Sequence, residues 1–254
     1  MGQPHGLESS FRASPPAPAL PGDVVVRETL EELLDEVAED VATQASNCVR
    51  AFGDFHLALS GARAVRRLVM RLMIDPSFRE LPWKYTHVWV TSDLEVQETD
   101  DRSTIGMVQG LLGDHAGIPS AQIHAMSPHL PDGSNRYEDD LKQTLAWREK
   151  GHDRLDCVVL GVDSSGSIEG LAASTSSSDG LVVRDDPGGI RGLSMTTGLV
   201  RASRLISVLG IGEHGAPMHE MAKSELPGSI APLSGVLRWY LDHAACASEL
   251  KDGG

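Results

Sequence analysis

The sequence predicts a single α/β domain built on a mainly parallel sheet with helices on both faces. Strand candidates that are apolar throughout alternate with helical segments, which is typical of parallel strands buried on both faces. Three of these strand candidates also run directly into glycine, at Ser60-Gly61, Gly161 and Gly210. Glycine-containing loops of this kind gather at the carboxyl edge of a parallel sheet, where ligands bind.

The first half of the chain is predicted to supply three strand–helix units. β-Branched and aromatic residues predict strands over residues 24–26, 55–59 and 87–91. Apolar residues at helical spacing predict a helix after each strand, over residues 29–45, 62–74 and 103–112. Pro76 marks the end of the second helix, because proline cannot continue it.

The second half is predicted to complete the same sheet. Apolar runs predict strands over residues 156–160 and 204–209. Helices are predicted over residues 137–149, 217–223 and 235–250. Residues 161–192 are rich in serine and glycine, lack periodicity and are predicted to be loops. Because no repeat or linker interrupts the pattern, residues 23–254 are predicted to form one domain.

The N-terminal segment, residues 1–22, differs in composition from the rest of the chain. It contains five prolines among scattered serine, glycine and alanine. Such a segment cannot bury enough apolar surface to offset the entropy lost on ordering. We therefore expect it to be a disordered tail.

The net charge and the hydropathy of the chain exclude several classes of binding partner. The chain has 22 basic and 36 acidic residues, a net charge of −14, which argues against nucleic acid or an anionic membrane as partner. Its 41% hydrophobic and 23% charged residues are typical of an ordinary soluble protein. No apolar run approaches the ~18 residues of a membrane span, and the N-terminus lacks the features of a signal peptide.

The cysteines and histidines do not predict a metal site. Cys48, Cys157 and Cys246 are far apart and odd in number, so we expect free thiols in a reducing, cytoplasmic protein. His214 and His219 lie five residues apart, not the four that a zinc-binding HExxH helix requires. No cofactor-binding motif is present either, so no cofactor is predicted.

Two segments are candidates for binding an anion. The loop from Asp163 to Ser167 offers backbone N–H groups and hydroxyls, although it lacks the lysine and the spacing of a nucleotide P-loop. A plain loop is the alternative there. Ser60 and Gly61 precede a helix that begins near Arg63, so Ser60 either caps this helix or contacts a ligand oxygen.

Five blocks of sequence follow one another in an order that resembles a known family. They are residues 55–61, 92–95 with 102–104, 155–162, 193–196 and 232–242. Together they are similar to the 6-phosphogluconolactonases, within the wider sugar-phosphate isomerase/lactonase group, over roughly residues 23–250. The resemblance implies a Rossmann-like, doubly wound domain that binds a sugar phosphate or another small anion and needs no cofactor.

The resemblance also shows where this chain departs from the family in its catalytic loop. The family motif there reads Leu-Gly-Met-Gly-x-Asp-Gly-His-Thr-Ala, and its histidine is implied to activate the water that attacks the lactone carbonyl. In this chain that histidine falls on Ser167 and its acidic neighbour on Ser165. A serine hydroxyl cannot take up a proton reversibly near pH 7, so we expect the general base to be missing.

The basic residues that are implied to hold the 6-phosphate are also replaced. One arginine position carries Glu95, which reverses the charge. A second falls on Gly192, with Arg191 beside it, and a lysine position falls on Gly215, beside His214. A carboxylate in a phosphate pocket adds repulsion where attraction is needed.

The resemblance implies roles for individual residues at the ligand end of the sheet. Ser167 stands in the place of the catalytic histidine, with His214 as a substitute base. The expected ligand-binding residues are Ser60, Gly61, Asp93, Gly161, Ser165, Gly166 and Arg191. The sequence does not predict an oligomeric state.

Three functions are compatible with these residues. The first is a 6-phosphogluconolactonase-like protein with an eroded active site, catalytically weak or inactive, that retains a small-ligand or partner-binding role. The second is a working 6-phosphogluconolactonase of the pentose phosphate pathway with substituted catalytic residues. The third is a different enzyme on the same scaffold, with Asp163, Glu169 or His214 as acid or base.

Overall fold

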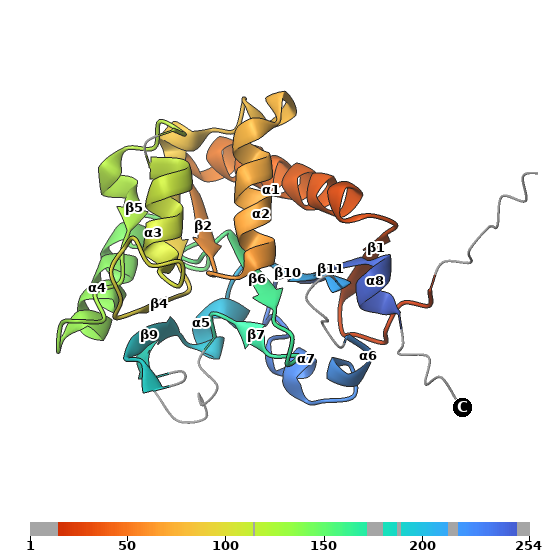
Figure 1. Cartoon of the computed structure of the whole chain (residues 1–254). Helices are drawn as coiled ribbons and strands as arrows, with labels where there is room; N and C mark the ends of the chain where they lie inside the picture. Colours follow the sequence, from red (N-terminus) through yellow and green to blue (C-terminus); the bar gives the residue numbers. More distant parts are fainter. Residues whose placement is uncertain (1–14, 114, 172–179, 187–188, 213–217, 248–254) are drawn as a thin grey trace, which may run out of the picture.

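A computed structural model describes residues 15–113, 115–171, 180–186, 189–212 and 218–247 (Figure 1). Its main sheet has a path of seven strands, each parallel to its neighbours. In spatial order they are β1 (Asp23–Arg27), β11 (Val236–Asp242), β10 (Leu205–Gly210), β6 (Cys157–Val162), β2 (Phe55–Leu59), β3 (Thr86–Val90) and β5 (Ile123–His124). The predicted doubly wound, mainly parallel sheet is confirmed.

Helices cover both faces of this sheet. On one face, Asp40 of α1 (Leu30–Phe52) accepts hydrogen bonds from Tyr240 and Arg238 of β11. The neighbouring α2 (Arg63–Ile74) packs against α1 and β6. On the opposite face, Tyr137 of α4 (Gly133–Leu145) meets the Trp89 ring edge-on and exchanges hydrogen bonds with the backbone of Val90.

The remaining helices are short. They are α3 (Thr104–Val108), α5 (Thr197–Arg201), α6 (Met218–Met221), α7 (Leu226–Ser229) and α8 (His243–Cys246). Single turns of 3-10 helix cover Pro76–Phe78, Trp83–Tyr85 and Ser120–Gln122, and a π-helical turn covers Gln109–Gly113. None of the helices within the described ranges is long and apolar enough to cross a membrane.

A second, smaller sheet stands beside the carboxyl edge of the first (Figure 1). It consists of β4 (Ser92–Leu94), β9 (Gly192–Met195) and β8 (Val182–Asp185), all antiparallel. A further short strand, β7 (Ile168–Glu169), folds back antiparallel onto the end of β6. The prediction of loops throughout residues 161–192 is therefore wrong for β7 and β8, which are too short for their periodicity to be recognised.

The predicted helix over residues 235–250 is also wrong. Residues 236–242 form β11, and of the described residues in this range only His243–Cys246 are helical. β11 lies between β1 and β10, and apart from Val236 its residues are buried or half-buried, with apolar side chains on both faces. A mostly apolar run of this kind cannot be told from a buried helix by periodicity alone.

The end of the N-terminal segment makes contacts that a disordered tail would not make. Pro18 is buried, and Leu20 packs against the core. The indole nitrogen of Trp239 donates a hydrogen bond to the carbonyl oxygen of Pro21 at 2.8 Å. The expected disorder therefore does not extend to residues 15–22, while residues 1–14 lie outside the described residues.

Candidate functional site

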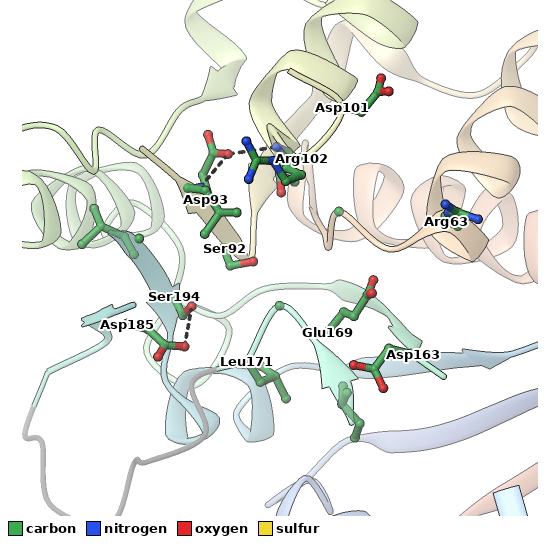
Figure 2. A pocket seen from close by; sticks show the side chains of 17 residues that line it. Arg63, Ser92, Asp93, Asp101, Arg102, Asp163, Glu169, Leu171, Asp185 and Ser194 are labelled. Carbon is green, nitrogen blue, oxygen red and sulfur yellow. Dashed lines mark hydrogen bonds between the residues drawn. The ribbon is translucent and has the colours of Figure 1, made fainter. Parts of the chain in front are cut away.

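A cleft of about 510 Å³ lies between the two sheets at the carboxyl edge (Figure 2). Gly61 and Arg63 line it from the turn after β2, and Asp93 lines it from β4. Glu169 contributes from β7 and Asp185 from β8. A second recess of about 330 Å³ shares Arg63, Asp163 and Glu169 with it. The carboxyl edge of the main sheet, where the sequence predicts a ligand site, therefore contains a cavity.

Asp93 is the most buried carboxyl group of the cleft, with 3% of its surface exposed. Its Oδ1 accepts hydrogen bonds from the backbone of Thr104 at 2.9 Å and of Leu94 at 3.1 Å. Burial nevertheless dominates and raises the pKa of Asp93 to about 6. This carboxyl group therefore exchanges its proton near neutral pH, as a general base or acid must.

Asp163 organises the turn between β6 and β7. Its Oδ1 accepts hydrogen bonds from Ser165 N at 2.8 Å, Ser165 Oγ at 2.6 Å and Ser167 N at 2.9 Å. Burial is outweighed by these hydrogen bonds, so the pKa of Asp163 lies below its usual value. The N–H groups of Gly166 and Asp163 are also used within the turn. The donors that the sequence suggests for an external anion are thus already held by the chain's own carboxylate.

Ser165, Gly166 and Ser167 line neither recess. Ser167 is exposed at the end of the turn, and its hydroxyl lies 3.0 Å from that of Ser165. Gly166 adopts a φ of 82°, which suits glycine in this tight turn. The next two residues, Ile168 and Glu169, are the ones that reach the cleft.

Glu169 faces the cleft beside Asp163 and Arg63 (Figure 2). Burial, followed by the negative charge of Asp163, raises the pKa of Glu169, and the charge of Arg63 opposes this rise. Glu169 is therefore a second carboxyl group of the cleft that holds its proton more tightly than usual. Figure 2 shows Asp93 on the opposite wall from Glu169.

Ser60 lies beneath the cleft surface rather than in it. It is fully buried, and its hydroxyl has no hydrogen-bond partner in the described structure. The same is true of the hydroxyl of Thr91, which directly follows β3. Gly170, which does line the cleft, covers both residues. A Cβ atom at Gly170 would lie 2.3 Å from Thr91 Oγ1 and 2.7 Å from Ser60 Cβ, so only glycine fits.

Gly61 and Gly161 have different roles. Gly61 lines the cleft, where a Cβ would approach Thr104 Oγ1 to 2.8 Å. Gly161 faces away toward α2, and a Cβ there would meet that of Ala62 at 2.4 Å. Gly161 is therefore needed for close packing of strand on helix. Gly210 likewise packs against Met218, and His214 lies outside the described residues.

Two of the three basic groups near the cleft are paired with acidic residues, and the third, Arg63, lies in a recess that two acidic residues also line. Arg191 Nη2 lies 2.7 Å from Glu95 Oε1 at the rim, and neither side chain lines the cleft. Arg102 donates from Nε and Nη2 to the carboxylate of Asp100, at 2.9 and 2.7 Å. Arg63 shares its recess with Asp163 and Glu169. No group of adjacent, unpaired cations is left for a phosphate among these residues.

The cleft lining as a whole is acidic. Among the described residues that line it, two are basic, Arg63 and Arg102, and five are acidic, which are Asp93, Asp101, Asp163, Glu169 and Asp185. None of the histidines within the described ranges lines the cleft. Sequence reasoning did not single out Asp101, Asp185, Gly170 or Ser194. Asp185 and Ser194 come from the small sheet, whose strands only the folded chain brings to the cleft.

A cluster at the amino ends of β2 and β3 offers potential metal ligands, namely Asp54, His56 and His87. Trp89 Nε1 donates to His56 Nδ1 at 3.1 Å, so His56 carries its proton on Nε2, which lies 2.8 Å from Asp54 Oδ2. Both ring nitrogens of His56 are therefore engaged in hydrogen bonds. A metal ion would have to displace one of them, so this set fits a hydrogen-bonded array better than a metal centre.

Comparison with known proteins relates this chain to one family. Residues 28–239 match the family model described as glucosamine-6-phosphate isomerases/6-phosphogluconolactonase. The GDH/6PGL endoplasmic bifunctional protein of Homo sapiens is 30% identical over 255 residues, covering 94% of this chain and 31% of that protein. The chain thus spans about a third of this relative. A 6-phosphogluconolactonase of Haemophilus influenzae is 26% identical, covering 85% of this chain and 95% of the relative.

Solved structures share the fold. A 6-phosphogluconolactonase from Thermotoga maritima superposes with a TM-score of 0.72 at 19% identity, covering 87% of this chain and 99% of that one. A monomeric glucosamine-6-phosphate deaminase gives 0.70 at 18% identity, covering 88% and 98%. At these identities the likeness shows the fold alone.

Proposed function

The chain belongs to the glucosamine-6-phosphate isomerase/6-phosphogluconolactonase family, and from that premise we propose a 6-phosphogluconolactonase-like protein with an eroded active site. It is catalytically weak or inactive and retains a small-ligand or partner-binding role. The observation that carries this proposal is the charge of the cleft, whose described lining contains two guanidinium groups and five carboxyl groups. A site built to hold a phosphate dianion needs the opposite balance.

The hydrogen bonds of the anion loop support the same proposal. Ser165 N and Ser167 N donate to Asp163, so a bound anion would have to displace a carboxylate that is held by three hydrogen bonds. Glu95 engages Arg191 in the same way at the rim. In both places an acidic side chain of the protein occupies the donors that a phosphate or an oxyanion would use.

The missing general base supports weak catalysis. By the resemblance to the family motif, the catalytic histidine falls on Ser167, a residue that is exposed and does not line the cleft. Losing a positioned general base typically removes about 10²–10⁴-fold in rate. Loss of the phosphate-binding cations lowers the occupancy of the site in addition, so the two defects reinforce each other.

A working lactonase with substituted residues is the second candidate, and one observation favours it. Asp93 lies in the cleft with a pKa raised to about 6, which is the property of a carboxyl group that can act as a general base. In this alternative Asp93 would activate water in place of the missing imidazole, with Arg63 as the remaining cation of the cleft.

The deciding experiment measures hydrolysis of 6-phosphogluconolactone by the full chain, with the spontaneous opening of the lactone subtracted. We expect at most a marginal rate above the spontaneous one, and no change on Asp93→Asn. A robust, saturable rate that is abolished by Asp93→Asn or His214→Ala would support the working lactonase instead. Asp153→Asn, an exposed site away from the cleft, is the matched control.

The cytoplasmic location expected from the sequence stays a prediction. All three cysteines are buried and unpaired, which suits a reducing compartment. Absence of nucleic-acid and membrane partners is likewise proposed from the net charge of −14.

A further inference from the structure

We infer that the cleft selects a neutral, hydroxyl-rich monosaccharide over the phosphate ester of the same sugar. This inference rests on the proposed function. The expected ligand in the family is anionic, so this reverses the preference that the resemblance implies. Three features of the cleft lead to it: its charge, the pairing of its cations and the kind of groups that line it.

The charge of the lining opposes an anionic ligand. Five carboxyl groups and two guanidinium groups line a cavity of about 510 Å³, so a phosphate placed anywhere in it lies near several acidic side chains. Coulomb repulsion between like charges is stronger in a recess than in bulk water, because the walls exclude solvent. A neutral ligand avoids this repulsion.

Two of the three cations near the cleft can offset this repulsion only by breaking contacts that already exist. Arg102 is engaged by Asp100 through two hydrogen bonds, and Arg191 by Glu95 at the rim. Arg63 faces a recess that it shares with Asp163 and Glu169. Binding a phosphate at Arg102 or Arg191 therefore exchanges one anionic partner for another and yields little net attraction. A phosphate at Arg63 lies beside the carboxyl groups of Asp163 and Glu169, which oppose its binding.

The lining is well suited to sugar hydroxyl groups. Carboxylates accept hydrogen bonds, and each hydroxyl of a monosaccharide supplies a donor. Ser92, Thr104 and Ser194 add side-chain hydroxyls, which both donate and accept. Leu171 and Leu193 offer apolar surface on which the C–H face of a sugar ring can pack. The volume falls within the usual range of small-molecule pockets, about 300–1,000 Å³.

Two-dimensional NMR of the full chain tests this inference with a matched pair of probes, D-glucose and D-glucose 6-phosphate. The amides of Gly61, Gly170 and Gly192 line the cleft and report on binding. Gly53 and Gly151 lie outside it and serve as internal controls. We expect glucose to shift the cleft glycines selectively, with a Kd at least about tenfold below that of glucose 6-phosphate.

A variant with fewer charges tests whether repulsion by the carboxylates, rather than the shape of the cleft, disfavours the phosphate ester. In Asp101→Asn/Asp185→Asn, two carboxylates of the cleft become neutral with little change in size. We expect the ratio of the two Kd values to narrow by about tenfold, mainly through tighter binding of the phosphate ester. Glu39→Gln/Asp139→Asn makes the same change of charge at exposed helix positions and should leave the ratio unchanged.

Two results would overturn the inference. One is binding of glucose 6-phosphate as tight as that of glucose; the other is no shift of the cleft glycines at about 50 mM glucose. Neither result depends on the rate of lactone hydrolysis. A fast lactonase rate would instead overturn the proposed function, whatever the ratio of the two Kd values.

Discussion

Glu95 and Arg191 are joined twice, although 96 residues separate them in the chain. Their side chains form an ion pair at 2.7 Å, and the backbone N–H of Glu95 donates to the carbonyl oxygen of Arg191 at 2.7 Å. The resemblance to the lactonases places an arginine at position 95 and another at position 192. The pair therefore neutralises the basic side chain that remains at this rim.

Neutralising Glu95 should release Arg191 without unfolding the rim. The Arg191 side chain is 64% exposed, and exposed ion pairs contribute about 0–1 kcal/mol. In Glu95→Gln we expect the melting temperature to change little and the affinity for glucose 6-phosphate to rise several-fold. Titration calorimetry measures the affinity. The double variant Glu95→Gln/Arg191→Gln should lose this gain, and persistence of the gain would show that Arg191 is not its source.

Removing the carboxylate of Asp163 should open the anion loop. Asp163→Ala frees Ser165 N and Ser167 N, which then become available to inorganic phosphate. We expect phosphate to shift the amide signals of these two serines in the variant and not in the unaltered protein. The variant should lose about 1 kcal/mol of unfolding free energy, since water replaces part of the lost hydrogen bonding.

Asp153→Ala is the control for that substitution, because Asp153 accepts one turn hydrogen bond from Gly151 N at 2.8 Å, outside both recesses. It should leave the serine amides insensitive to phosphate. An unaltered protein that already binds phosphate at Ser165 and Ser167 would contradict the view that Asp163 fills this site.

Restoring the family histidine alone should not restore lactonase activity. Ser167 is exposed and lines neither recess, and Ser167→His leaves Glu95 paired to Arg191. We expect Ser167→His to hydrolyse 6-phosphogluconolactone at the background rate, and Ser167→His/Glu95→Arg to be the smallest change with a measurable rate. Full activity of the single variant would show that phosphate binding is intact.

Acid should weaken the fold through His87. Its Nδ1 lies 3.0 Å from His124 Nε2, and its ring stacks on His56 at 4.7 Å between centroids. Burial, followed by the neighbouring His56 and His124, lowers the pKa of His87 from 6.5 to about 4. The unfolded chain therefore binds this proton more tightly than the folded one. The contribution of neutral His87 to the free energy of unfolding is fully present above pH 6.5 and is lost as the pH falls toward 4.

His87→Asn removes the titrating group and keeps a donor toward His124. Between about pH 7 and pH 5, we expect the unfolding free energy of the variant to fall by about 1–2 kcal/mol less than that of the unaltered protein, discounted for partial exposure. Urea titrations at both pH values measure it. Asp93, whose raised pKa acts in the opposite direction, is present in both proteins and cancels. An equal effect of His129→Asn, at an exposed site, would contradict this assignment.

Deletion of the N-terminal segment should destabilise the protein only when residues 15–22 are included. Deleting residues 1–22 removes the hydrogen bond from Trp239 to Pro21 and the packing of Leu20 on the core. We expect this deletion to cost about 1–3 kcal/mol, by the loss of one hydrogen bond and of apolar burial. Deletion of residues 1–14 removes none of the described contacts and is the control. Equal melting temperatures of the two variants would show that residues 15–22 contribute nothing.

The sequence alone determined the parts of the fold that local patterns encode. The apolar run over residues 55–59 and the helical spacing after it predict β2 and α2 closely, because each is specified by its own residues. The same patterns place Gly61 and Asp93 at the ligand edge, since parallel strands bring their carboxyl ends together.

Only the tertiary structure decided which side chains reach the cleft and what they face. Residues 236–242 are a strand because β1 and β10 flank them, and no local pattern records those neighbours. Ser167 and Glu169 are two residues apart, yet only Glu169 lines the cleft, because β7 folds back on β6. The pairing of Arg191 with Glu95 likewise depends on the contact of β9 with β4. Charge balance in a cavity is set by distances between remote segments, and those distances exist only in the folded chain.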